Sequence, residues 1–174
     1  MSDAKSLGSL AKPLIAIGAD HGGFEQKQLL ISWLSEQGYQ MSDCGAFVLD
    51  ESDDYPQFAQ AVAQTVTTVQ ADGLSAVGIL VCRSGAGMVI AANRYKGVRA
   101  VGVFSPEQAV HARAHNDANI IVLSGDWMNL DDMQSYIQTF LQTPFSGESR
   151  HQRRLAQIEQ ITQIEQIDQT NPQL

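Results

Sequence analysis

The apolar residues of this chain fall into short runs that alternate with longer stretches of helical spacing. Four runs are apolar and too short for helices, and a fifth is weaker, so we expect five strands at 14–19, 39–44, 77–81, 98–104 and 119–125. The helical stretches between them lie at 25–37, 56–71, 88–93, from Ser105 onward, and at 130–141. The alternation predicts an α/β fold, a Rossmann-like three-layer sandwich with a five-stranded parallel sheet and an additional C-terminal helix.

The C-terminal stretch has a different pattern. Ser149–Arg154 forms a basic cluster, and residues 155–167 carry isoleucine at every third position. We expect a helix whose early part packs against the body of the protein or a partner subunit. The predicted organisation is a flexible tail at 1–12, a single domain at 13–167 and a frayed end at 168–174.

Composition narrows the possible partners. The 174 residues suffice for one domain, and the net charge of −8 argues against nucleic acid and anionic membrane surfaces. No apolar run approaches membrane-spanning length. The two cysteines, Cys44 and Cys82, have neither disulfide-framework nor metal-site spacing. We therefore expect a cytoplasmic protein without a metal site.

The most informative stretch runs from the third predicted strand into a glycine-rich loop and a helix. The loop contains Cys82, Ser84, Gly85 and Gly87. Strand, tight turn and helix start together aim backbone N–H groups at an anion, with the thiol beside it. A simpler interpretation remains: Cys82 is a small buried residue and Ser84 only caps the helix.

Other polar groups permit both a structural and a functional interpretation. Asp20 and His21 follow the first strand, at the edge where parallel sheets bind ligands, but Asp20 could simply cap a helix. His115 and Asn116 end a helix, where a histidine is common for dipole reasons. Arg150 and Arg154 share a helix face, which suits either solvent or a phosphate.

Taken together, these residues resemble the type B ribose-5-phosphate isomerase family, which includes galactose-6-phosphate isomerase subunits. The resemblance runs from Ile15 to about Ile158. The ordered motifs that carry it are Gly18–Phe24, Asp54–Pro56, Gly78–Cys82, Ser84–Gly87, Ile90–Asn93, His115–Asp117 and Arg150–Arg154.

The resemblance implies an aldose–ketose isomerase that acts on a sugar phosphate without a cofactor. Cys82 matches the base that moves a proton through an enediolate, and His115 the residue that opens the sugar ring. The backbone N–H groups of Arg83, Ser84, Gly85, Ala86 and Gly87 would stabilise the enediolate. Substrate-binding positions are matched by Asp20, His21, Tyr55, Asn116, Arg150 and Arg154. The family also implies a homodimer or homotetramer with sites shared between subunits.

Ribose 5-phosphate and ribulose 5-phosphate are the expected substrates. The alternatives are a hexose 6-phosphate of the allose or galactose type, or a sugar-phosphate-binding protein without catalysis. A flavodoxin-like or nucleotide-binding domain is disfavoured, because its phosphate loop would follow the first strand.

Two positions depart from the family pattern. Arg83 replaces a glycine, and Asp126 stands where many members carry an arginine for phosphate. The hypothesis is that Arg83 restores the lost positive charge. We also expect the helix start and Arg83 to lower the pKa of the Cys82 thiol.

Overall fold

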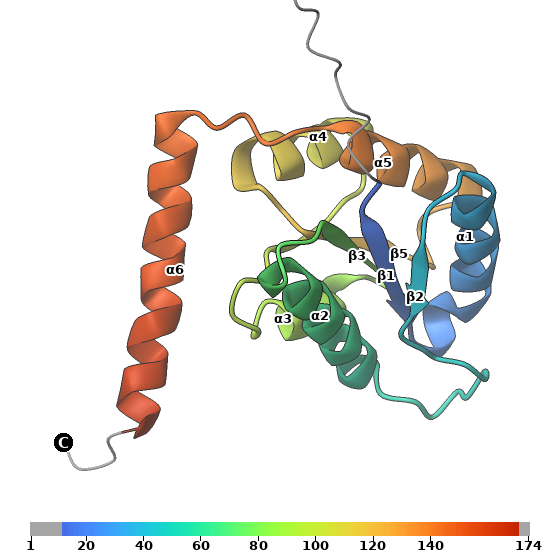
Figure 1. Cartoon of the computed structure of the whole chain (residues 1–174). Coiled ribbons are helices and arrows are strands. Elements are labelled where there is room, and N and C mark those ends of the chain that lie inside the picture. Colours follow the sequence, from blue (N-terminus) through green and yellow to red (C-terminus); the bar gives the residue numbers. More distant parts are fainter. Residues whose placement is uncertain (1–11, 171–174) are drawn as a thin grey trace, which may run out of the picture.

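A computed structural model describes the backbone of residues 12–170 and the side chains of residues 12–161. Its centre is a five-stranded sheet in the order β2-β1-β3-β5-β4, with every neighbouring pair parallel (Figure 1). The strands are β1 Leu14–Ala19, β2 Met41–Asp43, β3 Ala76–Cys82, β4 Ala100–Gly102 and β5 Ile120–Ser124. The predicted fold class is confirmed. The edge strands β2 and β4 are shorter than expected, since each pairs with its single neighbour along three residues.

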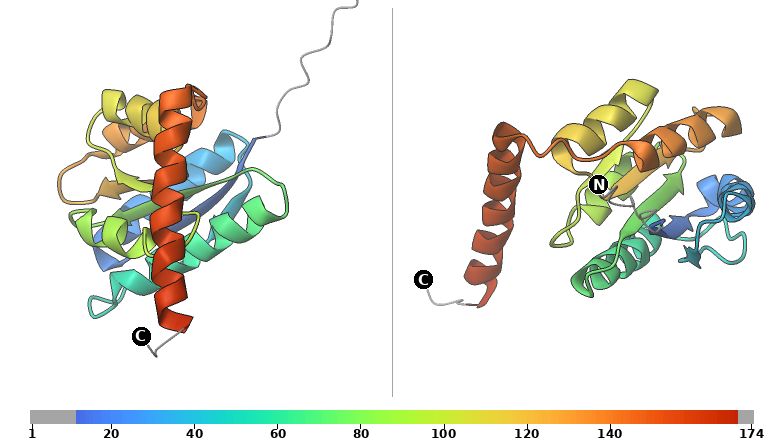
Figure 2. Two further views of the ribbon diagram at one scale, coloured as in Figure 1. Left: turned by 90° about the vertical axis from the view of Figure 1, so that its left-hand side faces the viewer. Right: turned by 45° about the horizontal axis from the view of Figure 1, so that its top comes forward.

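Helices cover both faces of the sheet. They are α1 Phe24–Glu36, α2 Tyr55–Ala71, α3 Ala86–Ala92, α4 Pro106–Asn116, α5 Leu130–Gln142 and α6 Ser149–Thr170, with a short 3₁₀ turn at His21–Gly23. α1, α4 and α5 pack on one face and α2 and α3 on the other, which makes three layers (Figure 2). Ser105 caps the start of α4 by accepting a hydrogen bond from the Gln108 N–H, and Gly38 and Gly73 follow the ends of α1 and α2 with positive φ.

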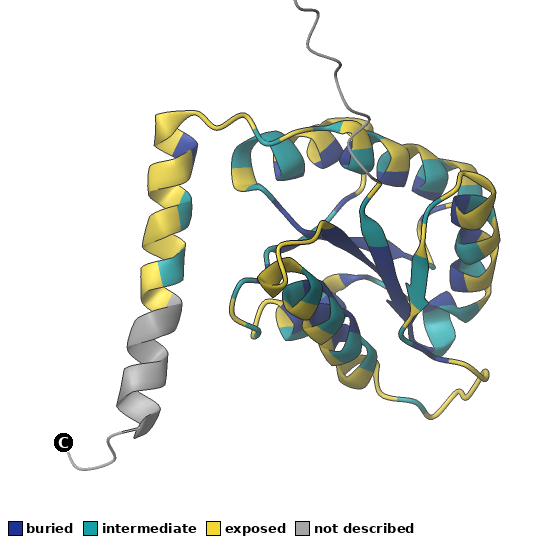
Figure 3. Cartoon of the chain, viewed as in Figure 1, coloured by how far each residue is buried: buried dark blue, intermediate teal, exposed yellow. Residues whose placement is uncertain are grey.

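The central strand β3 is buried along its whole length (Figure 3). Because successive side chains of a strand point to opposite faces, Ile79 contributes to the core beneath α1, α4 and α5, and Leu80 to the core beneath α2 and α3. This double burial explains why the strand reads as a continuous apolar run. It also fixes the position of Cys82 at the end of the strand.

α6 stands beside the sandwich and is mostly exposed along its described part (Figures 1 and 3). Its first turn is held to α4 by His151, which is buried, and further along Glu159 pairs with Arg99 at 3.5 Å. The helix continues to Thr170, past the boundary expected at 167. Residues 1–11 of the predicted N-terminal tail, and 171–174 of the predicted C-terminal tail, lie outside the described residues. Within the described part of the chain, no helix is long and apolar enough to cross a membrane.

Candidate active site

The candidate site lies at the carboxyl edge of the sheet, between β1 and β3. The chain winds to opposite sides from these two strands, so this is the switch point where α/β sheets bind ligands. Asp20 follows β1 and Cys82 ends β3, and the two strands run in register through the pair Ala19 and Val81. Asp20 and Cys82 therefore lie at the same edge of the sheet.

The loop after β3 surrounds the thiol with backbone donors. The Gly85 N–H donates to Cys82 Sγ at 3.2 Å, and the N–H groups of Ser84 and Met88 also favour the thiolate. Ser84 Oγ accepts a hydrogen bond from the Ala86 N–H at 3.3 Å in the turn before α3, but the N-cap residue of α3 is Gly85, so Ser84 does not cap the helix. The loop thus gathers several backbone N–H groups around the thiol at the end of β3.

Two glycines allow other site residues to reach this loop. A Cβ atom at Gly87 would lie 2.6 Å from Cζ of Tyr55, so the tyrosine ring packs directly on the start of α3. A Cβ atom at Gly22 would overlap the side chain of Arg83. Side chains at either position would separate the β1 loop, the α2 start and the thiol loop.

The pKa of the Cys82 thiol is raised, which corrects the sequence expectation. Burial of the side chain is the largest cause, and the nearby Asp20 carboxylate adds to it. The hydrogen bonds from Gly85, Met88 and Ser84 act in the opposite direction but do not outweigh burial. Arg83 is not among the main causes of this shift, and its Nε donates to Asp126 Oδ2.

Asp20 and His21 are held by local hydrogen bonds. Asp20 Oδ1 accepts from the Gly22 N–H at 2.9 Å, and burial raises the pKa of this carboxyl. Asp53 Oδ1 lies 2.7 Å from His21 Nδ1 and also accepts from the His21 N–H at 3.1 Å. The hydrogen bond to Asp53 is the main reason that the pKa of His21 is raised. The other oxygen of Asp53 is buried without a hydrogen-bond partner.

Asp20, His21 and Asp53 are also the one group, among the described residues, with three or more His, Cys, Asp or Glu side chains placed to hold a metal ion. Their ligand atoms lie within 4.8 Å of one another. Asp20 and Asp53 already serve as hydrogen-bond acceptors for the 3₁₀ turn at His21–Gly23.

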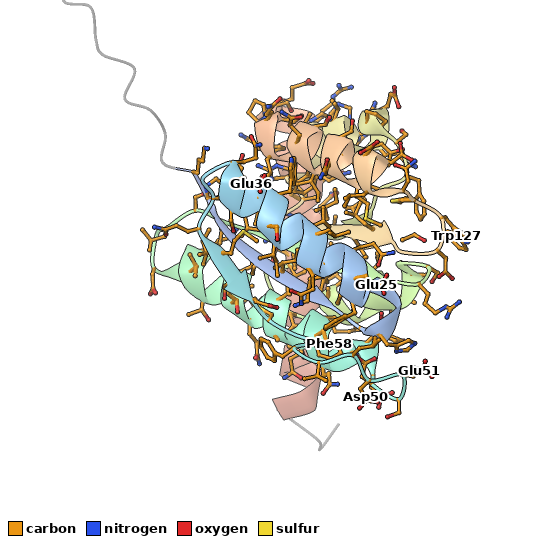
Figure 4. The ribbon with its side chains drawn as sticks, turned by 90° about the vertical axis from the view of Figure 1, so that its right-hand side faces the viewer. Glu25, Glu36, Asp50, Glu51, Phe58 and Trp127 are labelled. Atoms are coloured by element: carbon orange, nitrogen blue, oxygen red, sulfur yellow. The ribbon has the colours of Figure 1, made fainter. Side chains whose placement is uncertain are left out.

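Arg83 and Asp126 lie on adjacent loops and form an ion pair. Arg83 Nε donates to Asp126 Oδ2 at 3.2 Å. Both residues line a pocket of about 590 Å³. Its other lining residues are His21, Gly22, Glu25, Gln26, Leu49, Glu51 and Gly125. Glu25, Glu51 and Trp127, which adjoins Asp126, lie toward the same end of the molecule (Figure 4).

The remaining predicted site residues lie elsewhere in the same chain. His115 and Asn116 end α4, which precedes β5, so they adjoin the amino end of that strand. Cys82 pairs with Ser124 at its carboxyl end. At about 3.3 Å per residue, the five residues of β5 separate the two groups by roughly 15 Å. One chain therefore does not bring His115 to Cys82.

His115 is part of a row of three histidines from α4 and α6. His111 Nδ1 lies 3.1 Å from His115 Nδ1, and the rings of His115 and His151 are 4.4 Å apart between centroids. Desolvation lowers the pKa of His115, and the charges of His151, His111 and Arg150 lower it further. Arg150 and Arg154 are exposed on α6 beyond this row, and Arg150 pairs with Glu148 at 2.8 Å.

Several residues of the pocket beside His21 and of the histidine row on α4 and α6 were not identified from the sequence. Asp53 was one of several acidic residues in a loop, and nothing in the sequence linked it to His21 across 32 positions. His111 carried a usable signal, because residues four apart on a helix are neighbours. Glu25, Gln26 and Glu51 carried no signal of pocket lining.

Fold and site define a Rossmann-like α/β protein with a thiol-bearing loop at the ligand-binding edge of its sheet. A family model described as Ribose/Galactose Isomerase matches residues 15–158. The chain therefore belongs to the Ribose/Galactose Isomerase family.

Curated relatives agree with this assignment. The chain is 42% identical over 141 residues to ribose-5-phosphate isomerase B of Mycolicibacterium paratuberculosis, a match that covers 81% of this chain and 86% of the relative. Ribose-5-phosphate isomerase B of Escherichia coli is 38% identical over 144 residues, covering 83% and 93%.

Experimental structures give the same result. Ribose-5-phosphate isomerase B from Mycoplasma genitalium, solved with bound ribulose-5-phosphate, superimposes with a TM-score of 0.80 at 35% identity, covering 86% of this chain and 96% of that one. The type B enzyme of Trypanosoma brucei gives 0.79 at 42% identity, with coverage of 86% and 99%.

Proposed function

We propose that the protein interconverts ribose 5-phosphate and ribulose 5-phosphate, with Cys82 as the base. The observation that carries the proposal is the buried thiol at the switch point, surrounded by the N–H groups of Ser84, Gly85 and Met88. The thiolate would take the proton from C2 of the open-chain aldose. The electron pair would move to the carbonyl oxygen O1 to form an enediolate, and the hydroxyl proton of O2 would pass to O1. The C2–O2 carbonyl then forms as the thiol returns its proton to C1, which gives the ketose.

The enediolate carries a negative charge that the loop N–H groups can stabilise. Asp20, His21 and Tyr55 surround the same loop and would bind sugar hydroxyls or the phosphate. The raised pKa of Cys82 makes the thiolate the minor form at neutral pH in the free protein. Catalysis by this residue therefore becomes faster as the pH rises toward the thiol pKa.

A second copy of the chain would complete the site. His115 and Asn116 lie at the opposite, amino edge of the sheet from Cys82. The His115 ring contacts His151 of α6, and the same part of α6 carries Arg150 and Arg154. If this edge of one subunit faces the thiol loop of another, His115 reaches the sugar ring and the arginines reach the phosphate. The proposed assembly is a homodimer or a homotetramer of such dimers, in a reducing cytoplasm that keeps both cysteines free.

The test is an assay of ribose 5-phosphate conversion to ribulose 5-phosphate with the wild type and Cys82→Ala. We expect turnover by the wild type and a loss of at least 10³-fold in the variant, with Cys44→Ser as the matched control that retains activity. Turnover unaffected by Cys82→Ala would contradict the cysteine base.

The same assay with allose 6-phosphate and galactose 6-phosphate tests the hexose alternative. A non-catalytic sugar-phosphate-binding protein is the second candidate. The raised pKa of the Cys82 thiol favours it, because a protonated thiol is no base. Binding of ribose 5-phosphate without turnover at any pH between 6 and 9 would establish this alternative.

A further inference from the structure

We propose that Arg83 anchors the substrate phosphate on the Cys82 side of the site and that Asp126 is the residue that positions it. The inference rests on the proposed function, because it concerns how that sugar phosphate is held. Arg83 and Asp126 follow adjacent strands, β3 and β5, and their backbones are joined. The Arg83 carbonyl accepts from Ser124 Oγ at 2.6 Å and from the Asp126 N–H at 3.1 Å.

The side chain of Arg83 is guided in two places. Its Cγ lies against Gly22, where any Cβ atom would overlap it. Its Nε donates to Asp126 Oδ2 at 3.2 Å. Because this bond uses Nε, the donors on Nη1 and Nη2 can be used to bind a phosphate.

His21 adds a second basic side chain to the same pocket, and it is a cation when its imidazole is protonated. Asp53 raises the pKa of the His21 imidazole, and the charge of Arg83 acts against this increase. The two cations are therefore close enough to interact, and an anion between them would be attracted by both. Each cation has its own carboxylate, Asp53 for His21 and Asp126 for Arg83.

The acidic residues of the pocket restrict where the phosphate can bind. Glu25 and Glu51 are exposed and lie near one another in Figure 4. Their charges repel a phosphate and so favour the part of the pocket beside His21 and Arg83. Asp126 repels the phosphate too, but its contact with Arg83 orders an exposed arginine that would otherwise lose more side-chain entropy on binding.

The test measures affinity without turnover. Ribitol 5-phosphate has no carbonyl group and cannot isomerise, and ribitol is the same ligand without the phosphate. By calorimetry, Arg83→Gly should weaken ribitol 5-phosphate binding at least tenfold and leave ribitol binding unchanged. Lys96→Gln, a charge-matched variant of an exposed residue outside the pocket, should change neither. Unfolding temperatures check that each variant is folded.

A relocation variant makes the test sharper. Arg83→Gly with Asp126→Arg moves the guanidinium to the neighbouring loop, and we expect it to recover most of the lost phosphate affinity. Asp126→Asn should raise KM for ribose 5-phosphate about threefold with kcat nearly unchanged, and Asp126→Glu should restore KM. A merely structural role of Asp126 would not produce this division between KM and kcat.

Three results would overturn the inference. The first is an Arg83→Gly variant whose affinity for ribitol 5-phosphate stays within twofold of the wild type. The others are a relocation variant that binds this ligand no more tightly than Arg83→Gly does, and an Asp126→Asn variant that binds it more tightly than the wild type. If the wild type isomerises ribose 5-phosphate but Arg83→Gly does not change the affinity for ribitol 5-phosphate, this inference is refuted and the isomerase proposal stands. Arg83-dependent binding of ribitol 5-phosphate without any turnover would refute the isomerase proposal and support the phosphate anchor.

Discussion

At Cys82, burial and backbone hydrogen bonds have opposite effects on the thiol. The side chain is 4% exposed, and burial disfavours the charged thiolate. Asp20 adds a negative charge nearby, whereas Gly85 and its neighbours donate hydrogen bonds that favour the charged form. Burial has the larger effect, so the pKa lies above the ordinary thiol value.

This balance predicts an alkaline pH dependence. If Cys82 is the base, kcat/KM for ribose 5-phosphate should rise about tenfold per pH unit below the thiol pKa, because kcat/KM reports the free enzyme. The measurement is a series of initial rates between pH 6 and pH 9. Ribitol 5-phosphate affinity over the same range is the control and should not show this rise. A kcat/KM that is constant from pH 6 to pH 9 would exclude the thiol as base.

The pKa values of His21 and His115 should lie on opposite sides of the ordinary histidine value. Asp53 raises the pKa of His21, so its imidazolium persists to higher pH. Desolvation and the charges of His151, His111 and Arg150 lower the pKa of His115, while Glu148 has a weaker opposite effect. NMR titration of the imidazole signals, assigned with His21→Asn and His115→Asn, should place His21 above His115.

The Asp53→Asn variant tests the cause of the difference. It should lower the pKa of His21, because Asp53 contacts His21. It should leave the pKa of His115 unchanged, because His115 contacts other histidines and not Asp53. If the two imidazoles titrate together in the wild type, the assigned environments are wrong.

Among the elements, burial determined what the sequence could predict. β1 and β3 are buried and continuously apolar, so their existence and position could be predicted from pattern alone. β2, Met41–Asp43, is short, lies at the edge and carries polar residues, so only its approximate position could be predicted. Its place in the sheet depends on a contact that no local pattern contains.

That contact is a buried ion pair between α1 and β2. Lys27 is fully buried, and its Nζ lies 2.6 and 2.7 Å from the two carboxylate oxygens of Asp43. Asp43 is less buried, with 31% of its side chain exposed, and it also accepts from the Gly45 N–H. Removing Asp43 therefore leaves a charge that is fully buried, whereas removing Lys27 leaves a charge that is partly exposed to water.

Asp43→Asn should lower the free energy of unfolding by about 3–5 kcal/mol, because it leaves a buried ammonium without a counterion. Lys27→Met should cost about 1–3 kcal/mol, because the remaining carboxylate reaches water. Glu36→Gln, an exposed charge on α1 (Figure 4), should stay within about 0.5 kcal/mol. Urea unfolding measures all three. Equal losses for the two partners would contradict the assigned asymmetry.

The candidate site was predictable where its residues are adjacent in sequence. The segment Cys82–Gly87 shows its chemistry in one strand, loop and helix, and Asp20–His21 follows a strand. The link between Arg83 and Asp126 spans 43 positions, and the effect of burial on the thiol depends on packing from several elements. Neither this contact nor the burial of the thiol can be inferred from the spacing of residues in the sequence. The expected direction of the thiol pKa shift was therefore wrong.

At the scale of the whole molecule, Cys82 and His115 lie far apart in one chain, whereas the proposed function requires both residues in the same active site. The two residues adjoin opposite ends of β5, and α6 extends from the His115 end with little contact to its own sandwich (Figure 1). Under the proposed function, a single subunit therefore presents two incomplete halves of the active site. A twofold pair in which each thiol loop faces the partner's α4 and α6 would contain two complete sites.

This arrangement predicts that two inactive variants can complement each other. Cys82→Ala and His115→Ala should each lose activity alone, but a mixed dimer contains one site with both residues intact. Random reassociation makes half of the dimers mixed, so co-refolded or co-expressed variants should recover about a quarter of wild-type activity. The control is the separate variants combined without subunit exchange, which should stay inactive. Exchange with no recovery, or full activity in a monomeric wild type, would show that the site is contained within one chain.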